Sequence, residues 1–275
     1  INGEIINADS MQVYKELKIL SARPNPKDYK KIKHHLYGFH NVKFNFSTGD
    51  WIKLAIKKIK EIKRRKKIPI FVGGTGLYFK ALTDGLVNIP NIPIRSRNKI
   101  RLLHKNLGQK KFYQKLLKLD PNSKDKINPT DAQRTIRAYE VKQFTKKSLH
   151  DWFKNTKSYF DKVDFFKIYI DFPRVDLIQK INKRTDQMFK IGVIHEVKRF
   201  IKLKVRKDKS VNKAIGINEI KEHLKYKNDL RQVREKISIK TRQYAKRQST
   251  WARGNMMSWL KLPPQDINKF LKKIK

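Results

Sequence analysis

Residues 68–76 read Ile68-Pro69-Ile70-Phe71-Val72-Gly73-Gly74-Thr75-Gly76, a continuous apolar run that ends in a glycine-rich turn. An apolar run bounded by turn residues is typical of a β-strand. A helical pattern of apolar residues resumes at Leu77. The stretch therefore predicts a strand, a tight turn and a helix in that order.

The residues upstream extend this pattern towards the N-terminus. Glu4 to Ala8 predicts a short buried strand that ends in a polar turn at Asp9 and Ser10. Asp50 to Lys66 predicts a helix, with Thr48 or Asp50 as its cap and with apolar residues at helical spacing, namely Ile52, Ala55, Ile56, Ile59 and Ile62. Strand, helix, strand, turn and helix together predict an α/β fold with a parallel sheet.

Two polar residues stand where strands of this sheet are expected to end. Asp9 follows the first strand and Thr75 follows the strand at 68–72. Ligands of open parallel sheets bind beyond the carboxyl ends of the strands. We therefore expect Asp9 and Thr75 to share one site.

The pattern changes after Pro90-Asn91-Ile92-Pro93. Residues 97–160 show helical periodicity and no convincing strand, so we predict a helical insertion domain there, with residues 1–96 and 161–275 forming the core. The core resumes with a strand at 165–172, a helix after Pro173, a long helix at about 229–253 and a last strand at 259–262.

Charge is the strongest feature of the composition. Lys and Arg number 67 against 24 Asp and Glu, a net charge of +43, which favours a polyanionic partner such as nucleic acid or an anionic membrane surface. The bias of an AT-rich genome towards Lys remains an alternative explanation. The sequence has no Cys, no apolar run long enough to cross a bilayer and no signal peptide, so we expect a soluble cytoplasmic protein without disulfides.

Several longer motifs occur in one order along nearly the whole chain. They are Asn7-Ala8-Asp9-Ser10-Met11-Gln12-Val13-Tyr14, His34-His35-Leu36, Val72 to Tyr78, Asp131 to Ala138, Arg184-Thr185-Asp186-Gln187-Met188, Ala214-Ile215-Gly216 and Thr241 to Gln248. In this order and spacing, the motifs resemble those of the tRNA dimethylallyltransferases. A single motif such as the Gly-Gly-Thr turn would be weak evidence for this resemblance.

The resemblance implies a P-loop NTPase-like parallel sheet flanked by helices and carrying the helical insertion. It also implies transfer of a dimethylallyl group from dimethylallyl diphosphate to the exocyclic N6 of an adenosine beside the anticodon of tRNA, with Mg²⁺ as cofactor. The implied partners are the tRNA anticodon stem-loop and dimethylallyl diphosphate, with no membrane, and we expect a monomer.

By the same resemblance, Asp9 is the base at the adenine amine, and Thr75 and Arg242 act in catalysis and bind the diphosphate. Each residue type also has a structural explanation that stays open: a turn or N-cap Asp, a capping Thr, and a solvated charged helix face for Arg242. Neither the spacing nor the resemblance assigns a metal ligand within this chain.

The implied tRNA contacts fall in five groups of residues. They comprise Asp9, Ser10, Met11, Gln12 and Thr75 near the sheet, Arg97 (or a plain surface Arg) at the entry to the insertion, Gln133, Arg134, Thr135, Ile136 and Arg137 in the insertion, Lys213 and Gly216, and Thr241, Arg242, Gln243, Lys246, Arg247 and Gln248 on the long helix.

The sequence also departs from the family pattern. It holds no G-x-x-x-x-G-K-[ST] motif, and it starts at Ile1 inside an expected strand, so we expect that the phosphate-binding loop lies before Ile1. Ile217-Asn218 stands where the family usually has Tyr-Lys, which weakens the tRNA assignment of 213–218. A P-loop phosphotransferase acting on a small molecule and a tRNA-binding remnant without activity are the alternatives.

The His34-His35 pair suggests a structural hydrogen bond more than a metal site. Neighbouring side chains diverge in a strand or helix, and no third ligand is suitably spaced.

Overall fold

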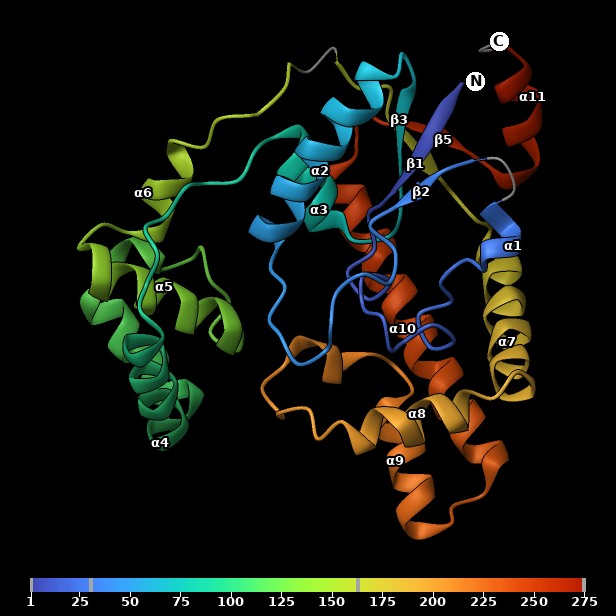
Figure 1. Cartoon of the computed structure of the whole chain (residues 1–275). Coiled ribbons are helices and arrows are strands. Elements are labelled where there is room, and N and C mark those ends of the chain that lie inside the picture. Colours follow the sequence, from blue (N-terminus) through green and yellow to red (C-terminus); the bar gives the residue numbers. More distant parts are fainter. Residues whose placement is uncertain (1, 30–31, 162–163, 274–275) are drawn as a thin grey trace. The chain divides into compact units, whose positions relative to one another are not determined.

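The computed structural model describes residues 2–29, 32–161 and 164–273. The chain divides into two compact units (Figure 1). The first comprises Ile1–Ala81 with Lys162–Lys275, and the second comprises Leu82–Asp161. The boundaries that we expected for the insertion, 97–160, fall within the second unit.

The first unit is built on a parallel sheet of three strands in the order β2-β1-β3. β1 (Gly3–Asn7) lies in the centre, β2 (His34–His35) pairs on one side and β3 (Ile68–Val72) pairs on the other. The register aligns Asn7 with Val72, so β1 and β3 end at the same edge. β4 (Ile168–Ile170) and β5 (Leu260–Leu262) form a separate parallel pair.

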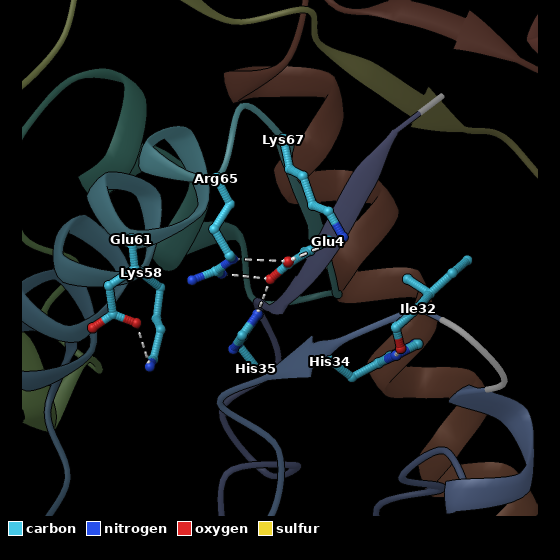
Figure 2. A network of polar contacts seen from close by, with 8 residues as sticks. All are labelled: Glu4, Ile32, His34, His35, Lys58, Glu61, Arg65 and Lys67. Carbon is cyan, nitrogen blue, oxygen red and sulfur yellow. Dashed lines mark hydrogen bonds and ion pairs between the residues drawn. The ribbon is translucent and has the colours of Figure 1, made fainter.

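A buried carboxylate ties the sheet to the end of α2 (Thr48–Arg64). Glu4 of β1 is fully buried and accepts hydrogen bonds from Arg65 at 2.7 and 3.1 Å, while His35 Nε2 of β2 lies 2.6 Å from it (Figure 2). Lys67 Nζ approaches the same carboxylate at 3.6 Å. One side chain thus fixes β1, β2 and the loop that leads into β3, and the expected structural hydrogen bond of the His pair is confirmed.

Helices of the first unit surround these strands and an apolar core. They are α1 (Pro26–Tyr29), α2, α3 (Gly76–Thr83), α7 (Arg174–Lys190), α8 (Val193–Lys202), α9 (Ile217–Tyr226), α10 (Leu230–Asn255) and α11 (Ile267–Lys273). The core joins Leu17 from the loop after β1 to Phe200, Ile217 and Ile237 from three helices. No helix within the described residues is both long and apolar enough to cross a membrane.

Within the described residues, helices are the only regular secondary structure that belongs wholly to the second unit. It contains α4 (Ile94–Leu119), a short 3₁₀ turn at Pro121–Ser123, α5 (Ala132–Thr145) and α6 (Leu149–Lys154). Gly108 interrupts α4 with a φ of 71°, a conformation that disfavours any residue with a Cβ. Phe112 and Leu116 pack with Val141 in a core of its own.

Three details differ from the sequence predictions. The cap of α2 is Ser47, whose hydroxyl accepts from the backbone N–H of Asp50 at 3.1 Å; Thr48 and Asp50, the residues that we expected to cap it, lie inside the helix. Asp50 completes a reciprocal capping box, which makes Ser47 the better cap. The strand expected at 165–172 shortens to Ile168–Ile170, and β2, which no pattern predicted, has only two residues.

Candidate active site at the end of the parallel sheet

The loops that leave β1 and β3 meet directly beyond the edge where both strands end. The backbone N–H of Thr75 donates to the carbonyl of Ala8 at 3.1 Å. The hydroxyl of Thr75 accepts from the backbone N–H of Ser10 at 2.9 Å and lies 3.3 Å from the hydroxyl of Ser10. The structure therefore places Asp9, Ser10 and Thr75 in one site, as the strand order predicted.

This close approach depends on Gly73. A Cβ at Gly73 would lie 2.2 Å from the carbonyl carbon of Ala8 and 2.3 Å from its oxygen. Backbone atoms held in a sheet cannot move away as the end of a side chain can. Only glycine at this position lets the turn after β3 lie against the turn after β1.

The Asp9 carboxylate is held by the backbone that follows it. Its Oδ1 accepts from the N–H groups of Met11 at 2.7 Å and Gln12 at 3.2 Å, and its own N–H donates to the side chain of Asn7 at 2.9 Å. Burial raises the pKa of Asp9, and the two N–H groups and the guanidinium of Arg184 oppose that rise. The result is a fixed carboxylate that binds a proton more readily than an ordinary Asp.

Three tyrosines lie within electrostatic reach of Asp9. Burial, with smaller contributions from Tyr29 and Asp9, raises the pKa of Tyr37 to about 12, and burial and Asp9 also raise the pKa values of Tyr78 and Tyr244. Tyr78 stacks on Trp51 at 4.3 Å between ring centroids. The phenols stay protonated at neutral pH, so they can donate hydrogen bonds, and the partly exposed Tyr37 and Tyr244 also offer flat surfaces.

α10 is far from the glycine-rich turn in the sequence but contacts it in the fold. Gln248 Nε2 donates to the carbonyl of Gly74 at 2.8 Å, and Trp251 lies so close to Gly76 that a Cβ there would approach the indole within 2.4 Å. About three turns of α10 lie between Gln248 and Ile237, which is buried in the N-terminal half of the helix. The Thr241–Gln248 motif therefore runs alongside the Asp9 site.

The basic residues of that motif are placed less tightly. Gln243, Lys246 and Arg247 are exposed, whereas Thr241 and Arg242 are half-buried. Among the described residues no hydrogen bond or ion pair joins Arg242 to Asp9 or Thr75, so its assignment to the diphosphate stays a prediction. Arg247 lies 5.6 Å from the ring centre of Tyr244, which keeps its charge near the site.

The stretch at 213–218 divides between surface and core. Lys213 is exposed. Gly216 is buried, and its N–H donates to Glu219 at 2.8 Å, while Lys240 forms an ion pair with the same carboxylate. Of the two residues that we assigned to tRNA here, Lys213 alone presents a charged group to solvent.

The second unit contains its own cationic cluster. Arg97, Arg101 and Arg137 surround Glu140, which is 1% exposed, at N–O distances of 3.3, 3.6 and 3.4 Å. One carboxylate neutralises one of the three guanidinium groups, so the cluster keeps a positive charge in a fixed place. Arg97 and Arg137, which we assigned to tRNA from the sequence, are therefore neighbours.

The other insertion residues that we assigned to tRNA differ in exposure. Gln133 and Arg134 are exposed, and Arg134 pairs with Asp131 at 3.2 Å. Ile136 packs on the core of the unit. Thr135 is fully buried and donates to the carbonyl of Asp131, so its side chain holds α5 in place and does not reach solvent.

Sequence reasoning passed over four residues that the structure brings to these sites. Arg184 belongs to a motif that we quoted without giving it a role, and Tyr244 lies within the Thr241–Gln248 motif but was assigned no role, although it is 39% exposed. Tyr37 and Arg101 carried no signal in the sequence. Their positions follow from packing alone.

The site offers oxygen atoms but no dedicated metal cage. Within the described residues there is no group of three His, Cys, Asp or Glu side chains that could hold an ion. Asp9, Ser10 and Thr75 supply a carboxylate and two hydroxyls. This small set suits Mg²⁺, which usually takes one or two protein oxygens and completes its shell with substrate phosphates and water.

Comparison with known proteins identifies the group to which the chain belongs. The IPP transferase family model matches residues 12–255. The chain is 59% identical over all of its 275 residues to the tRNA dimethylallyltransferase of Pelagibacter ubique (strain HTCC1062), covering 88% of that protein. A eukaryotic dimethylallyltransferase solved while acting on tRNA superposes with a TM-score of 0.84 at 27% identity, covering 99% of this chain and 71% of that one.

A bacterial structure agrees with these two. The full-length tRNA isopentenylpyrophosphate transferase of Bacillus halodurans superposes with a TM-score of 0.68 at 30% identity, covering 99% of this chain and 86% of that one. Sequence and fold thus point to the same group over nearly the whole chain. The chain belongs to the IPP transferase family.

Proposed function

We propose that the protein transfers a dimethylallyl group from dimethylallyl diphosphate to N6 of an adenosine next to the anticodon of tRNA. The observation that carries the proposal is the Asp9 carboxylate, fixed at the end of the sheet beside Thr75 in a chain of this family. The 59% identity with a tRNA dimethylallyltransferase over the whole chain supports the choice of substrates.

The reaction needs a base because the amine of adenine is a poor nucleophile. The N6 lone pair forms a bond to C1 of the dimethylallyl group, the C1–O bond breaks, and diphosphate leaves with the bonding electrons. N6 then carries one proton too many, and Asp9 accepts it. A carboxylate whose pKa is raised by burial is a stronger base for this step than an exposed one.

The leaving diphosphate requires positive charge and hydrogen-bond donors near Thr75. In the proposal the hydroxyls of Thr75 and Ser10 and the guanidinium of Arg242 face the diphosphate, and preorganised donors of this kind stabilise developing charge. Mg²⁺ bound to the diphosphate would neutralise part of that charge. Ser10 and Thr75 would be the protein oxygens that hold it.

The tRNA contributes its anticodon loop, from which the target base must swing out to reach Asp9. We assign the flanking RNA to Met11, Gln12 and the exposed residues of the Thr241–Gln248 stretch, and to Arg97, Arg134 and Arg137 of the second unit. In the same proposal, the protein acts as a monomer in the cytoplasm, where its tRNA substrate is found.

A transfer assay tests this function. The complete gene product is incubated with Mg²⁺, labelled dimethylallyl diphosphate and anticodon stem-loops that carry adenosine or uridine at the target position. We expect label on the adenosine RNA alone. Equal label on both RNAs contradicts the assigned target, and label on neither contradicts the enzymatic function.

The Asp9→Asn variant tests the base. Asn keeps an oxygen for the N–H groups of Met11 and Gln12 but cannot accept a proton, so we expect transfer to fall by about 10²- to 10⁴-fold. RNA affinity should change little. If affinity and transfer fall together, Asp9 holds the binding surface and is not the base.

A further inference from the structure

A pocket of about 810 Å³ opens in the first unit between the loop at 18–25 and α7. Its volume is in the range of pockets that bind small molecules or single nucleotides. Ile19, Met188 and Ile191 give it an apolar floor. Nothing in the function proposed above uses it.

The charged residues around this pocket are all of one sign. Its lining within the described residues includes five cations, Lys18, Arg23, Lys180, Lys183 and Arg184, and no carboxylate. Lys180, Lys183, Arg184 and Gln187 are spaced so that they lie along one face of α7, and Ile191 directly follows the helix. An apolar floor under a cationic rim suits a ligand with a flat apolar part and a phosphate.

The loop wall is held in place before any ligand arrives. The buried carboxylate of Glu196 on α8 accepts the N–H groups of Lys18, Ile19 and Leu20 at 2.7, 2.8 and 2.9 Å. Arg23 donates to the carbonyl of Tyr14 at 3.0 Å. A wall fixed in this way loses little conformational freedom when it binds.

Further along the same wall, the backbone is held in a strained form. Arg184 donates to the carbonyl of Leu20 at 3.2 Å, which joins α7 to the loop. Ala22 has a φ of 49°, a left-handed conformation that non-glycine residues rarely adopt. Strained backbone that the surroundings hold in place is found most often at ligand sites.

Two residues connect the pocket to the Asp9 site. Gln12, whose backbone N–H binds the Asp9 carboxylate, donates through its side chain to the carbonyl of Ser21 at 3.0 Å. Arg184, at the pocket rim, is close enough to Asp9 to act on its charge. A ligand in the pocket is therefore a direct neighbour of the group that binds the target base.

We infer that this pocket binds the nucleotide of the RNA strand next to the target adenosine, with its base on the apolar floor and its phosphate on the Lys180, Lys183 and Arg184 side. The inference rests on the proposed function, because it assumes a target base at Asp9. When a base swings out of a loop, its neighbours lose a stacking partner, and an apolar surface beside the site replaces that partner.

Salt-dependent binding of an anticodon stem-loop tests the rim. Lys180→Gln with Lys183→Gln is compared with Lys57→Gln and Lys60→Gln on α2; both pairs are exposed, three residues apart, and on helices of 17 residues. We expect the slope of log affinity against log salt to become shallower by about 0.7 in the α7 variant, the value for one lost phosphate contact, and to stay unchanged in the α2 variant.

A second variant tests the floor. Ile191→Asn removes apolar surface without changing charge, so we expect affinity to fall roughly fivefold or more at an unchanged salt slope. A photoreactive nucleotide placed directly beside the target adenosine should crosslink to α7 or to the loop at 18–25.

If the salt slope became equally shallow in both double variants, the RNA would respond to the overall positive charge of the protein and not to this pocket. That result would overturn the inference. A raised KM for dimethylallyl diphosphate with unchanged RNA binding would assign the pocket to the prenyl donor and also overturn it. RNA binding that depends on the pocket, in a protein that transfers no prenyl group, would support the pocket and contradict the proposed function.

Discussion

Asp9 places a charge where the protein disfavours it. Burial raises its pKa from 3.8 on folding, so at intermediate pH the folded state binds more protons than the unfolded state. Stability then falls as the pH rises through the interval between the unfolded and the folded pKa. The charge on Asp9 is thus expected to reduce the stability of the fold at neutral pH.

We predict that Asp9→Asn raises the melting temperature at pH 7 although it lowers transfer by about 10²- to 10⁴-fold. The gain should shrink as the pH falls from the folded pKa towards 3.8, and it should be absent well below 3.8, for example at about pH 2.5, where Asp9 is protonated in both states. Thermal unfolding at both pH values measures this. Asp151→Asn is the control, because Lys154 lowers the pKa of Asp151 and its loss should give no such gain; a destabilised Asp9→Asn protein would contradict the prediction.

Glu4 shows the opposite behaviour. Its hydrogen bond with Arg65, and a weaker one with His35, lower the pKa of Glu4 from 4.5 to about 2, although burial opposes them. A lowered pKa contributes stability above the unfolded value of 4.5, and this contribution is lost as the pH falls from 4.5 to 2. Part of the acid sensitivity of the first unit should therefore reside in the network of Figure 2.

We predict that Glu4→Gln lowers the free energy of unfolding at pH 7 by about 1.5–3 kcal/mol, the usual value of hydrogen bonds to a charged group. The difference from the wild type should disappear towards pH 2. Urea unfolding over this pH range measures it. Glu61→Gln, at a partly exposed pair with Lys58, should change little.

At the scale of elements, the site depends on how closely two turns and one helix approach each other. Gly73 brings the turn after β3 against Ala8, and Gln248 and Trp251 of α10 lie on the same turn. α10 supplies buried Val233 and Ile237 to the core and Gln248 to the glycine-rich turn. Because α10 takes part in both, the packing of the core helps to fix the positions of Gln248 and Trp251 at the turn.

We predict that Gly73→Ala costs roughly 1–3 kcal/mol of stability, as overpacking does, and reduces transfer more than RNA binding, because it separates Thr75 from Ser10. Gly254→Ala in α10 is the matched control. No atom lies within 4 Å of a Cβ at that position, and Ala favours a helix over Gly by up to about 1 kcal/mol, so stability should stay equal or rise. An equal loss of stability and transfer in both variants would show that the close approach at Gly73 is not the cause of the loss.

At the scale of the whole molecule, the net charge of +43 has two possible origins, genome composition and RNA binding. The arginine cluster on Glu140 and the cationic rim on α7 are ordered arrangements, which a compositional bias alone would not produce. They favour binding of a polyanion. Each unit carries one such arrangement.

We predict that affinity for the anticodon stem-loop falls by about 10³-fold between 50 and 200 mM salt, as expected when roughly six phosphates are neutralised. Binding measured at four or more salt concentrations gives the slope. A nearly flat dependence would show that the surface charge is not used for RNA. The Glu140→Gln variant should leave the slope equal or steeper, because it removes the one charge that neutralises the arginine cluster.

The sequence by itself determined the class of fold and the position of the site. The apolar run at 68–72 became β3 at the same residues, the long helix expected at 229–253 is α10, and the order of the strands placed Asp9 beside Thr75. These features follow from local pattern and from the topology of parallel sheets, both of which are written along the chain. The family motifs added the chemistry.

Only the tertiary structure decided which distant side chains meet. Arg184 acts on Asp9 from another part of the chain, Glu196 holds the loop at 18–20, and Arg97, Arg101 and Arg137 gather around Glu140. Thr135, which has a place in a matched motif, proved to be buried. Periodicity reports which face of an element is apolar, but contacts between elements depend on how those faces pack in three dimensions, and a single sequence does not record that packing.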